Sequence, residues 1–254
     1  MTRRMPIAIA LSSALLCAGA AHGQATVKPD GKWRFALGAG ANLSSGNSDA
    51  TTLNLNGDGV RVTEIDKWSM SGRFLYGRND GVKTSDLLEL RGRYDRNLNG
   101  QWFGFGSGEF LRDEPANLSS RVSAAAGVGY HVFKTEENRW DVFTGLGYSQ
   151  ESYFEAQLIA GEVQSHRGYG EVLLGEESTH RFTDTTSFRQ RFVVYPNLTD
   201  SGELRTTFDA GVAVAINKTM SLTVTLSHRY NSDPGAGLSK DDTSLVAGVS
   251  AKFD

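Results

Sequence analysis

The sequence lacks several features on which common classes of protein depend. It contains one cysteine and five prolines in 254 residues. After the first two dozen residues it has no long apolar run. This excludes transmembrane helices but not β-barrel strands, because the apolar residues of such strands are spread over alternate positions. It also lacks a basic block and has a formal charge of −3, so nucleic acid is not expected as a partner.

The first 23 residues have the composition of a secretory signal peptide. Arg3 and Arg4 give a basic start, residues 5–20 are apolar apart from two serines, and small residues precede Gln24. An N-terminal membrane anchor is the alternative for the same stretch, but such an anchor needs about 20 apolar residues. The shorter run therefore favours a signal peptide at residues 1–23.

Cleavage after residue 23 would change the chemistry of the mature chain. It removes Cys17, so no thiol remains for a disulfide, a metal site or a nucleophile. It also removes two arginines, which changes the formal charge from −3 to −5. We expect residues 24–32 to form a short periplasmic segment. Residues 33–254 are expected to form one barrel domain, since no Pro-rich or low-complexity linker divides them.

Alternation of apolar and polar residues is the dominant pattern of the mature chain. It is clearest in Met220–Tyr230 and Ser244–Phe253, and it recurs along the preceding residues. A period of two over about ten residues is typical of a strand with one apolar and one polar face. The pattern gives about twelve strands, an even number, with an aromatic residue in the closing strand. It predicts an all-β fold, an antiparallel transmembrane β-barrel.

The connections between the expected strands are of two kinds. Those after odd-numbered strands are mostly longer and more polar, as outer-membrane barrels show for their outer loops. We therefore expect both chain ends on the periplasmic side, and a partner surface on the outer loops around residues 44–49, 151–164 and 231–242. One strand, 102–111, puts its glycines on the lipid face and Phe103 and Phe105 inside, which leaves its register open.

Aromatic residues recur at two levels of the expected barrel. Four tryptophans each open an outward-running strand, and three of these strands carry a second aromatic residue eight positions later. Eight tilted strand residues rise roughly 20 Å, close to the separation of the aromatic girdles that flank the apolar band. We predict a membrane girdle that consists of Trp33, Trp68, Tyr76, Trp102, Phe110, Trp140, Tyr148 and Phe253.

Two other architectures fit the sequence less well. The near-regular spacing of the tryptophans resembles a helical repeat of about 34 residues, but strict alternation contradicts the period of 3.6 that helices require. A soluble periplasmic β-sandwich or lipocalin-like barrel would have large apolar residues on its inward face. The chain has arginines and acidic residues there.

Charged residues occupy the face of the expected strands that points into the barrel. Because buried charges need partners, they could pair with one another and fill a narrow lumen. The excess of arginines supports a second interpretation, a pore for small anions or acidic sugars, since rings of arginine suit anion pores. The predicted lumen-lining residues are Arg73, Glu89, Arg91, Arg93, Asp95, Glu109, Arg121, Asp141, Arg189, Arg191, Arg205, Asp209 and Arg229.

An enzyme is the third class that we consider. A barrel lipase needs a serine or acidic nucleophile beside a base, and His228 directly follows Ser227. Adjacent strand residues point to opposite faces, so these two do not form a pair, although a cross-strand partner stays open. No metal-ligand cluster and no phosphate-binding loop stands out. We predict no catalytic residue, no metal site and no cofactor.

Short motifs along the chain resemble one family. Ser45–Asp49 and Thr51–Leu55 look like the opening hairpin of the YdiY-like family, which is described as salt-induced outer membrane proteins of unknown function. The GVGY sequence at 127–130 and GLGY at 145–148 look like its middle strands. The resemblance implies a Gram-negative outer membrane location and a link to salt stress, but no activity. The final residue, Asp254, departs from the usual aromatic ending of such barrels.

Together these observations predict an outer-membrane β-barrel of the bacterial envelope, either a narrow channel or a structural barrel linked to salt or osmotic stress. The alternatives are a channel for small anions or acidic oligosaccharides and an outer-membrane enzyme of the lipase type. The expected partners are the lipid bilayer with its lipopolysaccharide, the barrel-assembly machinery during insertion, and small anionic solutes.

Overall fold

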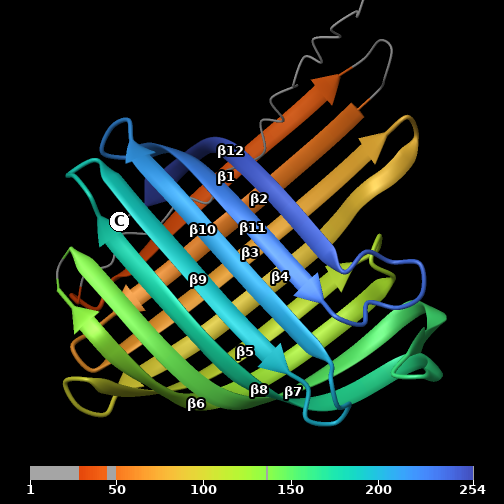
Figure 1. The fold of residues 1–254 in the computed structure, drawn as a ribbon. Coiled ribbons are helices and arrows are strands. Elements are labelled where there is room, and N and C mark those ends of the chain that lie inside the picture. Colours follow the sequence, from red (N-terminus) through yellow and green to blue (C-terminus); the bar gives the residue numbers. More distant parts are fainter. Residues whose placement is uncertain (1–28, 45–49, 136, 254) are drawn as a thin grey trace, which may run out of the picture.

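The computed structural model describes residues 29–44, 50–135 and 137–253. In these ranges the chain forms twelve strands, each paired antiparallel with its neighbours in sequence, and β1 closes the barrel against β12 (Figure 1). The strands are β1 Trp33–Ser44, β2 Ala50–Val62, β3 Asp66–Asn79, β4 Val82–Asn97, β5 Trp102–Asp113, β6 Leu118–Lys134, β7 Asn138–Ile159, β8 Glu162–Arg181, β9 Thr186–Pro196, β10 Leu204–Ala215, β11 Met220–Asn231 and β12 Asp241–Phe253.

The predicted fold class, an antiparallel β-barrel of about twelve strands, is confirmed. The signal peptide and residues 24–28 lie outside the described residues, as does the loop at 45–49. In the described ranges no helix is long and apolar enough to cross a membrane. We call the end of the barrel at which β1 begins and β12 ends the near end, and the opposite end the outer end.

The prediction of a long connection at residues 151–164 is wrong. β7 continues to Ile159 and β8 begins at Glu162, so a two-residue turn, Ala160 and Gly161, joins two long strands. Both turn residues have positive φ, 52° and 81°, which matches the twist of a tight hairpin. The segment was predicted to be a loop because it is rich in polar residues. In the structure polar residues such as Glu151 are buried on the inward face of β7, and their polarity therefore does not mark a loop. The loop expected around 231–242 is present between β11 and β12.

The register left open for β5 places phenyl rings inside the barrel. Phe103 and Phe105 are almost fully buried, in a cluster with Phe143 and Val193. Glycines on the neighbouring strands make room for these rings, since a Cβ added to Gly129 would lie 2.1 Å from the ring of Phe103. The glycines of β5 itself face outward. The interior therefore contains one apolar region between β5, β7 and β9.

Elsewhere the barrel has an apolar outside and a polar inside. Outward residues such as Leu37, Leu146 and Leu245 are more than half exposed. On the inside, residues such as Asn54 and Thr223 are buried. A soluble barrel shows the opposite arrangement, so the wall has the pattern of strands that face lipid. Of the predicted girdle residues, Trp33, Trp68, Trp102, Tyr148 and Phe253 are exposed on this wall, while Tyr76, Phe110 and Trp140 are half-buried.

Candidate functional site

A layer of ion pairs crosses the lumen at mid-barrel. Arg91 on β4 donates from Nε to Glu109 of β5 at 2.9 Å, also contacts Glu89, and lies 3.5 Å from Asp209 on β10. Glu89 accepts a further hydrogen bond from Arg229 of β11 at 2.8 Å. These contacts connect strands on opposite sides of the barrel. We call Glu89, Arg91, Glu109, Asp209 and Arg229 the mid-barrel layer.

Further buried pairs lie toward the outer end. Arg121 donates to Glu151 at 2.5 Å, and this carboxylate also accepts from Tyr169 at 2.8 Å. Arg205 donates to Glu171 at 2.5 Å. Each charge is compensated, as burial in a low-dielectric interior requires. Salt bridges therefore also line the lumen above mid-barrel.

A cavity of about 1050 Å³ occupies the lumen. Its lining begins at the near-end turns, with Thr63 and Thr135, and extends past the mid-barrel layer to Glu171 and Arg205. Among the described residues, none of the outer-loop residues at 114–117, 160–161, 197–203 or 232–240 lines it. We call this cavity the vestibule. It is open along the lumen from the near end and ends below the outer loops.

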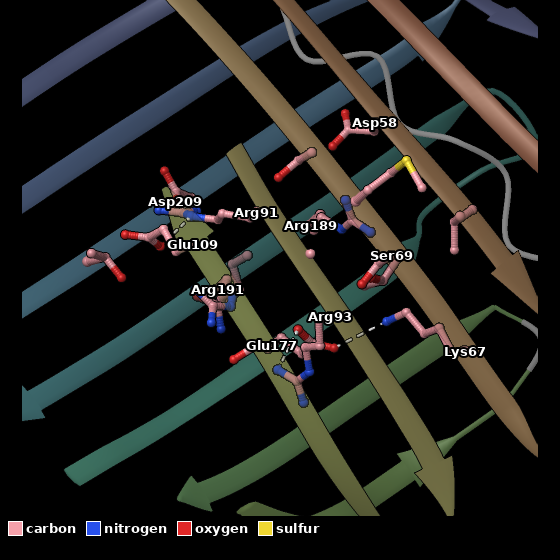
Figure 2. A pocket seen from close by; sticks show the side chains of 18 of the residues that line it. Asp58, Lys67, Ser69, Arg91, Arg93, Glu109, Glu177, Arg189, Arg191 and Asp209 are labelled. Carbon is pink, nitrogen blue, oxygen red and sulfur yellow. Dashed lines mark hydrogen bonds and ion pairs between the residues drawn. The ribbon is translucent and has the colours of Figure 1, made fainter. Parts of the chain in front are cut away.

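Cations outnumber their ion-pair partners in the vestibule. Arg189 and Arg191 line it, and the structure gives neither of them an ion pair within the described chain (Figure 2). The cross-strand neighbours of Arg189 are Thr179 and Gly211, which carry no charge. Two inward guanidinium groups without a carboxylate partner can bind a solute anion.

Two acidic residues are the cross-strand neighbours of Arg191, Glu177 on β8 and Asp209 on β10. The carboxylate of Glu177 is 3.4 Å from Lys67 of β3 and 3.9 Å from Arg93 of β4. Figure 2 shows Lys67, Arg93 and Glu177 on facing strands of the vestibule. Asp209 lies 3.5 Å from Arg91. Both carboxylates thus contact cations of the far wall, and the structure gives Arg191 no ion pair in the described residues.

Arg93 is held differently from Arg189 and Arg191. Its guanidinium carbon lies 4.4 Å from the ring centroid of Phe105 and 4.6 Å from that of Phe143, and its Nε donates to Asp95 at 2.7 Å. Aromatic rings on one side and a carboxylate on the other fix this side chain in place. Arg93 is a structural cation. Arg191 lies farther from the ring of Phe143, at 5.7 Å from its centroid, and has no ion pair in the described residues.

Of the residues predicted to line the lumen, eleven border the vestibule: Arg73, Glu89, Arg91, Arg93, Glu109, Arg121, Arg189, Arg191, Arg205, Asp209 and Arg229. Asp95 and Asp141 are buried beside it, and Asp141 accepts from Arg139 at 2.7 Å and lies 2.6 Å from Nδ1 of His131.

Several inward charges were not among the predicted lumen-lining residues. Lys67 lies near the start of β3, Glu177 lies near the end of β8, and Glu151 lies in the segment that was predicted to be a loop. Glu177 is on the same face of β8 as Tyr169 and Glu171, so alternation predicts that it points inward once β8 is known to reach that far. The length of the strand was what the sequence pattern did not give.

Histidines and clusters of acidic side chains are the groups that catalysis or metal binding would use. No group of three or more histidine, cysteine or acidic side chains is arranged to hold a metal ion in the described residues. His131 is buried between Asp141 and Asn97 and stacks on Phe103. His228 contacts Thr243 at 2.8 Å on the exposed side of β11.

Residues 37–253 match the model of the family described as "Protein of unknown function, DUF481". The chain belongs to this family. No curated protein matches the sequence. A family model of this extent covers the whole described barrel except its first residues.

Several solved structures are similar to this DUF481 barrel. The NanC porin shares 11% identity, over 86% of this chain and 96% of that chain, with a TM-score of 0.45. The translocator domain of the autotransporter NalP from Neisseria meningitidis shares 10% identity, over 87% and 88%, with a TM-score of 0.45. The outer membrane channel DcaP of Acinetobacter baumannii shares 11%, over 93% and 70%, with a TM-score of 0.37.

Proposed function

We propose that this DUF481 protein is a non-enzymatic barrel of the bacterial outer membrane and acts as a narrow channel for small anionic solutes. The apolar outer wall and the polar interior support insertion into a bilayer. Lipid with its lipopolysaccharide and, during insertion, the barrel-assembly machinery are the partners that such a barrel requires. The resemblance to the YdiY-like family supports a role under salt or osmotic stress.

The observation that carries the anion preference is the vestibule with its two unpaired arginines. Arg189 and Arg191 lie on the same strand, two residues apart, so their side chains share the inward face. A low-dielectric wall strengthens the attraction between such cations and an entering carboxylate, phosphate or sulfate group. Carboxylate, phosphate and sulfate are all compact anionic groups, and an acidic sugar carries such a group.

A structural barrel without transport is the second candidate. The mid-barrel layer favours it, because Arg91 and Arg229 join β4 to β5, β10 and β11 across the lumen. Such cross-lumen pairs narrow the path between the two ends of the lumen. Transport requires a path past these pairs, whereas a structural barrel requires only that they stay intact.

Single-channel recording of the mature protein, residues 24–254, in a planar bilayer tests the proposal. Under a salt gradient we expect stable openings whose reversal potential shows preference for anions. Replacing both arginines, Arg189→Ala with Arg191→Ala, should move the reversal potential toward zero. A folded protein that stays silent under all conditions would contradict transport and leave the structural barrel.

Arg112→Ala is the matched control for this experiment. Arg112 is an arginine of β5 whose side chain is 44% exposed and lies near Glu114 at the outer rim. Its removal changes the net charge of the protein by the same sign without altering the vestibule. The reversal potential of this variant should equal that of the unmodified protein. An equal loss of preference in both variants would mean that overall charge, and not the vestibule, determines selectivity.

A further inference from the structure

The hairpin of β7 and β8 changes direction at the outer end of the barrel. The two strands pair regularly up to Ser152 and His166, and pairing resumes at Gln157 and Gln164. Residues 153–156 of β7 therefore stand opposite Ser165 alone, which is a large bulge. Bulges bend the strand that carries them. The tip of the hairpin, residues 153–162, can thus leave the line of the barrel wall.

On one side the tip packs over strands that lie well away from β8. Tyr153 and Ile159 are buried against Leu87 of β4 and Leu111 of β5. The side-chain amide of Asn117 fixes this arrangement, since it donates to the carbonyl of Glu155 at 2.8 Å and accepts from its N–H at 2.9 Å. The apolar cluster seals the outer end above the ion pairs.

On the other side the same tip reaches the loop between β11 and β12. The backbone N–H of Ala160 donates to Oδ2 of Asp233 at 2.9 Å. Close by, the side chain of Gln157 lies so near Gly235 that an added Cβ would be 2.4 Å from Oε1. In Figure 1 the β7–β8 turn and the β11–β12 loop lie at the same end of the barrel. β4 and β11 flank the hairpin in opposite directions around the barrel, so a segment that touches both spans the mouth.

We propose that residues 153–162 form a lid that closes the outer end of the lumen, latched by the contact between Ala160 and Asp233. The proposal concerns the regulation of the channel proposed above and rests on that function for its physiological meaning. Opening requires that the latch break and that Tyr153 and Ile159 leave the apolar cluster. The bulge at 153–156 is the place where the hairpin bends.

The latch ties the hairpin turn to the neighbouring loop. Ala160 has a φ of 52°, as the two-residue hairpin turn requires. Its N–H is the group bonded to Asp233, so the latch joins this turn to the loop between β11 and β12.

A reversible cross-link tests the lid directly. The mature chain has no cysteine, so Ala160→Cys with Asp233→Cys introduces a unique pair at contacting positions. In planar bilayers the oxidised protein should lose the openings that the protein shows after addition of a thiol reductant. Equal conductance in the oxidised and reduced protein would overturn the proposal. Each single-cysteine variant serves as a control for the effect of the oxidant.

A second measurement does not depend on conductance. In Leu87→Cys the thiol lies in the apolar cluster beneath the lid and outside the lining of the vestibule, so its rate of modification by a membrane-impermeant maleimide reports opening. Adding Asp233→Ala should raise this rate about fivefold, the factor expected for the loss of one hydrogen bond. An unchanged rate, with circular dichroism showing a folded barrel, would overturn the lid. If the rate rises but the protein never conducts, the lid stands and the proposed channel fails.

Discussion

The mid-barrel layer and the rest of the vestibule are both rich in arginine, yet they use it differently. In the layer, Arg91 stands directly opposite Glu109 on the next strand, so an ion pair forms across one ladder position. In the vestibule, Arg189 stands between a threonine and a glycine and has no ion pair. The same residue type is therefore structural in one place and available to a solute in the other. Cross-strand register explains Arg91 and Arg189. Arg191 differs, because its cross-strand neighbours Glu177 and Asp209 contact cations of the far wall instead.

The largest effect is expected from removing the central carboxylate of the mid-barrel layer. In Glu89→Gln, Arg91 and Arg229 lose the buried carboxylate that they share. Breaking such a pair leaves an uncompensated charge, and we expect a loss of about 3 kcal/mol in the free energy of unfolding. Urea unfolding of the reconstituted barrel measures this loss.

Arg189→Gln is the comparison variant for that measurement. It also removes one charge, but the cross-strand neighbours of Arg189 are Thr179 and Gly211, and the structure gives it no ion pair in the described residues. Its free energy of unfolding should change by less than about 0.5 kcal/mol, as expected for a residue without a specific partner. Equal losses in the two variants would remove the distinction between the layer and the vestibule.

A smaller effect is expected where phenyl rings fix Arg93. In Gly129→Ala the new methyl group would overlap the ring of Phe103, which must shift. Overpacking of this kind costs about 1–3 kcal/mol, again measured by urea unfolding. Gly106→Ala is the control, because no atom lies within 4 Å of the added methyl group on the outer wall. If both variants were equally stable, the rings would not be tightly packed.

The sequence predicted the barrel because alternation is a local property of each strand. Leu222, Val224 and Leu226 alternate with hydroxyl residues whatever the register between strands. Pairing is not local. Whether Arg91 meets Glu109, or Arg189 meets a glycine, depends on the ladder between strands, which the sequence does not display. The long β7–β8 hairpin was missed for a different reason, since its turn-like composition predicted a loop at residues 151–164.

Salt should weaken the anion preference of the vestibule more than it weakens the stability due to the mid-barrel layer. Screening lengths fall from about 10 Å at 0.1 M salt to about 3 Å at 1 M, and solvated charges are affected most. The anion preference due to Arg189 and Arg191 should therefore decline between these concentrations. The free energy of unfolding, which includes the buried pairs of the mid-barrel layer, should change much less. Reversal potentials and urea unfolding at both salt concentrations test this prediction, and a parallel decline would contradict it.

The smallest effect is expected at an ion pair just outside the barrel. Asp30 precedes β1 and accepts two hydrogen bonds from the guanidinium of Arg34, at 2.8 and 2.5 Å, which lower the pKa of Asp30 below its ordinary value of 3.8. A lowered pKa in the folded state adds stability above the unfolded pKa, and this stability is lost as the pH falls below it. Asp30→Asn should therefore lower the urea midpoint slightly at pH 7. The difference in urea midpoint from the unmodified protein should shrink at pH 3. An equal difference at both pH values would show that the charge of Asp30 does not stabilise the folded protein through Arg34.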